Sequence, residues 1–265
     1  MKSVFLILAV LFSLLCSPLL GQNFSLDNPD NILSRRNKVA IENAITYKTA
    51  FFYRIFNNTV DFSEITFTII PNHFAYMLYQ SQIGISPVRQ SAGFFVPSRR
   101  ELVVCKDKRF RDTFLKTTFH ELSHAFLHLH ADGKYIPAWL DEGLAGYLEN
   151  MTFSSRRIRH RTNRFMIARV RTLIELQEVN LAEFVNWSYE RFARESFSQA
   201  GFGYAIAYCM VLFLMQQQNE ARTFTIFRNL IGGKSTIDVF NRYYEGGFAQ
   251  FERDFMAHFS QSGIR

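Results

Sequence analysis

The spacing of apolar and polar residues changes along the chain and predicts two kinds of secondary structure. Before residue 105 the predicted elements are a helix over 31–56, a strand over 64–70, a helix over 73–82 and a hairpin over 93–104. The hairpin turns at Pro97 and Ser98. Beyond it the pattern is almost wholly helical. Strands followed by a long series of helices are typical of the α+β class.

Two of the predicted helices occupy the middle of the chain. Asp112 can cap the first, whose apolar period runs to about His130, and Gly133 follows its end. Pro137 opens the second, because the first helical residue needs no N–H donor. Five later helices are predicted over 161–177, 199–217, 221–230, 235–244 and 248–259. The apolar run over 201–215 is too short to span a bilayer, so we expect a core helix there.

The first residues have the three regions of a secretory signal. Lys2 precedes an apolar run over 4–15, and Pro18 and the small residue Gly21 follow. The sequence therefore predicts a signal peptide over 1–21, with cleavage near Gly21. The mature protein would be exported, to the periplasm or the extracellular space.

Two kinds of membrane attachment agree less well with this segment. A spanning helix needs roughly 20 apolar residues, and Pro18 breaks this run. A lipid anchor on Cys16 needs a small residue just before the cysteine, where Leu15 stands. We expect no membrane span after cleavage. Because no repeat or linker follows, residues 22–265 are expected to form one domain with two lobes.

Composition excludes several classes of protein. A hydrophobic content of 48%, with 29 Phe, excludes a disordered chain. Only Cys105 and Cys209 remain after the signal, which excludes a disulfide-rich scaffold and favours two buried thiols. Seven arginines over 156–171 contribute to a net charge of +7 and would suit an acidic partner or a solvated basic face. No nucleic-acid-binding motif accompanies them, so we expect no nucleic acid partner.

The candidate chemistry begins with His120-Glu121-Leu122-Ser123-His124. Residues four apart on a helix lie about 40° apart around its axis, so both imidazoles can reach one metal ion. Glu121 flanks the same position and can act as a general base. A polar helix surface is the other interpretation of this spacing.

A catalytic zinc site needs a third protein ligand and an open position for water. His130 stands ten residues after His120, the spacing of the third histidine in metzincins. That arrangement needs the helix to break at a glycine, and Leu127 occupies this place. A continuous helix would turn His130 away from the metal.

Glu142 is the other candidate for the third ligand. It lies on the second helix beside small residues at 143, 145 and 146, which would allow that helix to approach the first. Its carboxylate could then complete a His-His-Glu set. We favour Glu142, with His130 as the alternative.

These residues together resemble the gluzincin zinc metallopeptidases. Within them the chain is similar to bacterial peptidase-MA-like domains and, more distantly, to the aminopeptidase branch. The matching features are the motif over 120–124, seventeen intervening residues, and a Trp-Leu-x-Glu-Gly-x-Ala-x-Tyr block over 139–147. The resemblance spans 64–259. It implies a zincin-like two-lobed metallopeptidase fold, with a small N-terminal sheet, an active-site helix and a mainly helical C-terminal lobe.

The resemblance also implies the roles of individual residues. His120, His124 and Glu142 would hold Zn²⁺ (zinc), and Glu121 would be the general base. Asp141 stands where many relatives carry Asn or Ser. A tyrosine about sixty residues beyond the third ligand stabilises the oxyanion in the aminopeptidase branch. Tyr204 is similar to it.

Two features limit the resemblance to the aminopeptidase branch. Ala207 stands where that branch usually has Gly, and Tyr208 is an alternative to Tyr204. The glutamate that grips a free amine is absent from the sequence over 91–95. We therefore expect an endopeptidase. Because peptides commonly bind by adding to a sheet edge, we expect a polypeptide substrate that lies extended against the strand near 93–96.

Two other functions are compatible with the same residues. One is a zincin-fold module that binds peptide or cell envelope without cutting, which the intact Glu121 disfavours. The other is a structural zinc site, which usually has four Cys or His ligands rather than the three found here.

Overall fold

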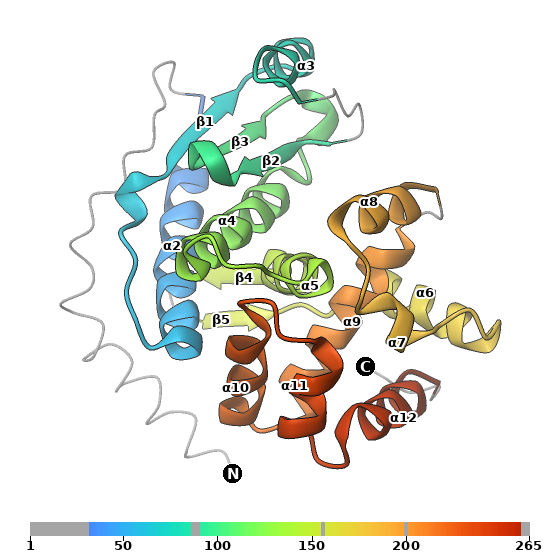
Figure 1. Ribbon diagram of the computed structural model, residues 1–265. Coiled ribbons are helices and arrows are strands. Elements are labelled where there is room, and N and C mark those ends of the chain that lie inside the picture. Colours follow the sequence, from blue (N-terminus) through green and yellow to red (C-terminus); the bar gives the residue numbers. More distant parts are fainter. Residues whose placement is uncertain (1–31, 86–90, 155–156, 199–200, 261–265) are drawn as a thin grey trace.

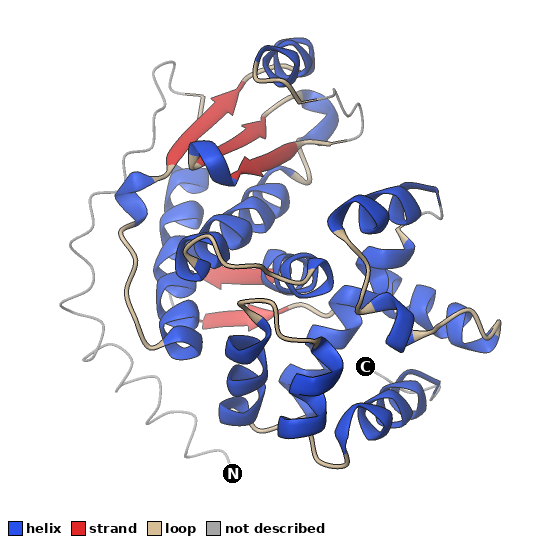
Figure 2. Cartoon of the chain, viewed as in Figure 1, coloured by secondary structure: helices blue, strands red, loops and turns tan. Residues whose placement is uncertain are grey.

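Two small sheets and a larger group of helices make up the described part of the protein, as the computed structural model shows (Figures 1 and 2). It describes residues 32–85, 91–154, 157–198 and 201–260. The α+β class predicted from the sequence is confirmed. The predicted signal peptide, residues 1–21, lies outside the described residues.

The bounds of the described elements are as follows. The helices are α2 (Arg35–Phe56), α3 (His73–Gln82), α4 (Phe114–Ala131), α5 (Ala138–Glu149), α6 (Arg164–Glu175), α7 (Leu181–Phe184), α8 (Tyr189–Ser198), α9 (Phe202–Gln217), α10 (Glu220–Leu230), α11 (Thr236–Tyr243) and α12 (Gly247–Ser260). The strands are β1 (Thr66–Ile70), β2 (Gly93–Val96), β3 (Glu101–Cys105), β4 (Met151–Ser154) and β5 (Arg157–His160).

The larger sheet has the strand order β1-β3-β2, with β1 parallel and β2 antiparallel to β3. Side chains alternate across β3: Leu102 and Val104 join the main core, whereas Val103 and Cys105 join a small core that includes Tyr76 of α3. Helices thus cover both faces of the sheet. The strand β2 is at the edge, close to α4 (Figure 1).

The helix α4 is unbroken from Phe114 to Ala131, as Leu127 indicated. It ends where Asp132 and Gly133 take positive φ angles of 50° and 72°. The N-cap is Thr113 rather than the predicted Asp112, and no side-chain hydrogen bond caps this end.

The helix α5 follows Pro137, as predicted, and lies between α4 and α9. The expectation that its small residues face α4 was wrong for both glycines. A Cβ on Gly143 would lie 2.5 Å from the backbone oxygen of Ala207, and one on Gly146 would lie 3.7 Å from the Cβ of Tyr208. Both glycines face α9, whereas Asp141, Glu142 and Glu149 of the same helix contact histidines of α4.

The helix α9 is the core helix that the apolar run predicted. Every residue from Ala205 to Leu214 is buried. Among the described residues, no helix combines the length and the apolar character needed to cross a membrane. Cys105 and Cys209 are buried free thiols, as expected.

The β4–β5 hairpin and the helices α7 and α8 were not predicted. The hairpin pairs Met151 with His160 in a part of the chain that was predicted to be almost wholly helical. Arginines at alternate positions of β5 obscure its apolar period. The helix α7 has only four residues, too few for a helical period to be visible.

Candidate metal centre and active site

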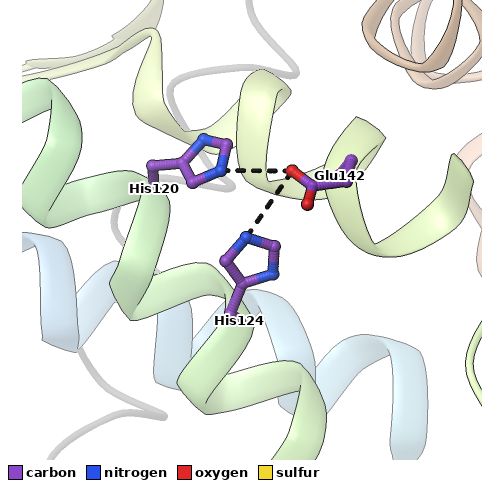
Figure 3. A group of neighbouring side chains, drawn as sticks. All are labelled: His120, His124 and Glu142. Atoms are coloured by element: carbon purple, nitrogen blue, oxygen red, sulfur yellow. Dashed lines mark ion pairs between the residues drawn. The ribbon is translucent and has the colours of Figure 1, made fainter. Parts of the chain in front are cut away.

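The candidate site lies where α4 faces α5 (Figure 3). His120 and His124 project from α4 toward Glu142 of α5. The Oε2 atom of Glu142 is 3.3 Å from Nε2 of His120 and 3.7 Å from Nε2 of His124. One ligand atom from each of the three residues lies within 4.8 Å of the others, so the group could hold one metal ion.

A second carboxylate fixes the orientation of each imidazole. Nδ1 of His120 is 3.0 Å from Oε2 of Glu149, and Nδ1 of His124 is 2.6 Å from Oδ1 of Asp141. An ionised carboxylate only accepts hydrogen bonds, so each Nδ1 donates. In the neutral ring the Nε2 atom then carries a lone pair and faces Glu142.

The oxygen of Glu142 that faces the two rings is buried and has no hydrogen-bond partner. When both rings are neutral, three atoms with lone pairs therefore converge on one another without a donor between them. A buried acceptor without a partner is costly, and a cation at this point would satisfy all three. The donor set of two imidazoles and one carboxylate suits zinc.

The carboxylates also shift the pKa values of the two histidines. Burial alone would lower the pKa of His124, but Asp141 and Glu142 outweigh it and raise the value to about 9. Burial likewise opposes protonation of His120, yet the adjacent carboxylates of Glu142 and Glu149 hold its pKa well above the ordinary value. Without a metal ion, protons occupy these rings at neutral pH.

Glu121 is buried beside the histidines and approaches the edge strand. Burial raises the pKa of its carboxyl group, against the attraction of His120 and His124. A Cβ on Gly93 would lie only 3.0 Å from Cγ of Glu121 and 2.7 Å from Cγ2 of Thr117. The absent side chain of Gly93 is what allows β2 to pass so close to α4.

A cavity of about 470 Å³ opens over these groups. Its lining includes His120, Glu121 and His124 of α4, Glu142 of α5, and Phe94 and Phe95 of β2. Tyr189 and Tyr204 also line it, contributed by α8 and α9. The cavity thus brings together a sheet edge, the candidate metal ligands and two phenol groups.

The structure separates the two candidate tyrosines. Tyr204 lines the cavity, and burial, followed by the charge of Glu142, raises the pKa of its phenol. Tyr208 lies in the core, where its hydroxyl accepts a hydrogen bond from the backbone N–H of Asn163 at 2.8 Å. Tyr204 alone of the two can reach a ligand in the cavity.

His130 is remote from the candidate ligands. Its ring stacks on Phe56 with centroids 4.9 Å apart, and its Nδ1 is 2.9 Å from Oδ1 of Asn58. This position accords with an unbroken α4, which turns His130 away from Glu142. The structure does not bring it into the metal-binding group.

Four residues at the site were given no role in it from the sequence: Asp141, His128, Tyr189 and Glu149. Asp141 contacts Nε2 of His128 at 3.1 Å and accepts a hydrogen bond from the Tyr189 hydroxyl at 2.5 Å, in addition to its contact with His124. Burial opposes ionisation of Asp141, but the charges of His124 and His128 and their hydrogen bonds to it keep its pKa below the ordinary value. Glu149 takes part through its contact with Nδ1 of His120.

Helical spacing could have indicated two of these four. His128 follows His124 by four residues on α4, and Glu149 follows Glu142 by seven, which is close to two turns of α5. Tyr189 has no such signal, because it comes from a separate helix that only the tertiary fold brings near.

Comparison with known proteins finds a similarity to a family without an assigned function. Residues 114–232 match a family described as a protein of unknown function, DUF1570. The matched range contains α4, α5 and α9, and leaves the β1-β3-β2 sheet outside. No curated protein matches the chain.

Proposed function

We propose that the protein is a zinc-dependent peptidase of the gluzincin type, with a zincin-like two-lobed fold. His120, His124 and Glu142 would hold the zinc ion. One observation carries the proposal: two oriented imidazoles and a buried carboxylate oxygen without a partner converge at ion-pair distances. Glu121, which a metal site alone does not require, argues for catalysis rather than for binding only.

When bound, zinc supplies a Lewis acid that lowers the pKa of water toward neutrality and polarises a carbonyl group. Glu121 would take the proton from the attacking water and return it to the leaving amine. Its raised pKa suits a group that must hold a proton between these two events. The hydroxyl of Tyr204 would donate a hydrogen bond to the oxyanion that develops.

An extended polypeptide is the proposed substrate. Among the described strands, β2 pairs with β3 alone, so its other edge is free to pair with a peptide backbone. Phe94 and Phe95 of that strand line the cavity, as does Glu121. A peptide added to this edge would lie over the candidate base.

The proposal is tested by metal analysis together with digestion of a peptide library. Purified protein should contain one zinc per chain and cleave internal peptide bonds, and a chelator should abolish cleavage. Glu121→Gln should retain zinc and lose turnover, because it removes the base without removing a ligand. Glu175→Gln, at an exposed position on α6, is the matched control.

Two results would contradict the assignment. Glu121→Gln with undiminished hydrolysis would show that another group is the base. Protein that binds zinc but cleaves no member of the library would support a binding module instead.

A further inference from the structure

A second cavity, of about 810 Å³, lies at the other end of the α4–α5 contact. Three basic side chains line it: Lys116 from α4, Arg161 after β5, and Arg164 at the start of α6. Leu115, Phe119 and Met151 contribute apolar surface. We call this the basic cavity.

The basic cavity adjoins the candidate active site. The helices α4 and α5 run antiparallel, with facing pairs His128 and Asp141, His124 and Asp141, His120 and Glu149, and Lys116 and Asn150. Glu149 lines the basic cavity, and its hydrogen-bond partner His120 lines the catalytic one. This pair is therefore a wall common to both. Lys116 precedes His120 by four residues, which is about 6 Å along the helix axis.

The positive charges of the basic cavity are not neutralised within the described part of the chain. No carboxylate there forms an ion pair with Lys116, Arg161 or Arg164, whereas other surface arginines such as Arg191 do have acidic partners. Glu149, the acidic residue that lines the cavity, is held by His120.

Backbone contacts fix the positions of the two arginines. The N–H of Arg161 donates to the carbonyl of Asn150 at 2.8 Å. Arg164 is the first residue of α6, and the side chain of Asn163 caps that helix through the N–H of Met166. The cations therefore project from an ordered frame, which reduces the entropy lost when they bind an anion.

We propose that the basic cavity binds acidic side chains of the polypeptide substrate. This inference rests on the proposed peptidase function. An extended chain advances about 3.3 Å per residue, so a side chain about two to four residues from the cleaved bond would reach Lys116 and the arginines. Apolar surface from Leu115 and Phe119, and a volume far larger than one phosphate, favour a peptide segment over a small inorganic anion.

The test measures peptide binding separately from cleavage. Two fluorescent peptides, identical except that one carries Asp-Asp where the other carries Asn-Asn, are titrated against the zinc-loaded Glu121→Gln protein by anisotropy. The Asp-Asp or Asn-Asn dipeptide is placed in turn at each position of the peptide. We expect the acidic peptide to bind about tenfold more tightly at its best position, with the advantage reduced by salt.

Substitution of the arginines should remove this preference. The double variant Arg161→Gln, Arg164→Gln is compared with Arg111→Gln, Arg159→Gln, which loses the same charge at exposed positions outside the cavity. The first should lose most of the preference, because only Lys116 remains in the cavity, and the second should retain it. Thermal unfolding checks that the variants fold. If the double variant does not fold, Lys116→Gln takes its place and should reduce the preference for the acidic peptide.

The outcomes distinguish this inference from the proposed function. Hydrolysis by the wild-type protein without an acidic preference, or with one that survives in the double variant, overturns the inference and leaves the peptidase. An arginine-dependent preference without hydrolysis leaves the cavity assignment and removes the peptidase. Binding of phosphatidylserine vesicles through these arginines, in place of the acidic peptide, also overturns it.

Discussion

His120 and His124 each use one ring nitrogen for a carboxylate and direct the other at Glu142. Zinc binds the neutral ring. Burial favours this form of His124, but the stronger effect of Asp141 and Glu142 raises its pKa to about 9. Below this pKa, zinc must displace protons from the histidine rings in order to bind. We predict that zinc affinity rises between about pH 6 and pH 9, with about two protons released per ion near neutrality. Calorimetry in buffers of different ionisation enthalpy measures this, and pH-independent affinity would contradict it.

The choice of third ligand separates Glu142 from His130. Glu142→Ala should weaken zinc binding by at least about a hundredfold, because two imidazoles remain. At neutral pH it should also lower the stability of the metal-free fold, because the protonated His120 and His124 lose a buried carboxylate that raises their pKa.

His130→Ala is the control for that substitution. It should lower the free energy of unfolding by about 1 to 2 kcal/mol through lost stacking with Phe56, with zinc content unchanged. The zinc content of each variant after dialysis shows which of the two residues is the third ligand. Zinc retained in Glu142→Ala and lost in His130→Ala would reverse the assignment.

The two tyrosines should respond to the same change in opposite ways. Tyr204→Phe should lower kcat by about 10²- to 10³-fold with little change in stability, because it removes one donor to the oxyanion. Tyr208→Phe should leave kcat unchanged and cost about 1 to 3 kcal/mol of stability, because the N–H of Asn163 loses its acceptor. A kinetic defect in Tyr208→Phe alone would show that the wrong tyrosine was assigned.

Among the elements, α5 determines where Glu142 lies, and its position depends on Gly143. A methyl group there would meet the carbonyl of Ala207 at 2.5 Å, so Gly143→Ala should push α5 away from α9. We expect a loss of about 1 to 3 kcal/mol and weaker zinc binding, because Glu142 is the neighbouring residue.

Gly146→Ala is a matched control on the same helix. Its methyl group would meet Tyr208 at an ordinary contact distance of 3.7 Å, so the higher helix propensity of alanine should leave stability equal or greater. Urea unfolding and zinc analysis of both variants test the difference. Equal losses in the two would contradict a specific role for Gly143.

Elements whose amphipathic or apolar period extends over several turns could be predicted from the sequence. The helix α4 with its His120 and His124 spacing is one, and α9 is another. The hairpin β4–β5 could not, because arginines occupy alternate positions and the pairing partner depends on packing against α2. Local periodicity carries no information about such contacts.

The same distinction applies to the candidate site. Glu142 could be proposed because it shares a short motif with Gly143, although the reason for that glycine proved to be α9 rather than α4. The hydrogen bond between Tyr189 and Asp141 could not be predicted, because it joins residues 48 positions apart on different helices. Interactions of this kind follow from the fold alone.

For the molecule as a whole, the close contact between α5 and α9 determines when the candidate site can form during synthesis of the chain. The helix α5 ends at residue 149, whereas α9 begins at 202, so a ribosome needs about 3 to 10 s to make the segment between them. Until α9 is available, Gly143 has no surface to pack on and α5 has no fixed position. His120 and His124 are thus made well before Glu142 can be held opposite them. The proposed peptidase would therefore stay inactive until α9 has been made.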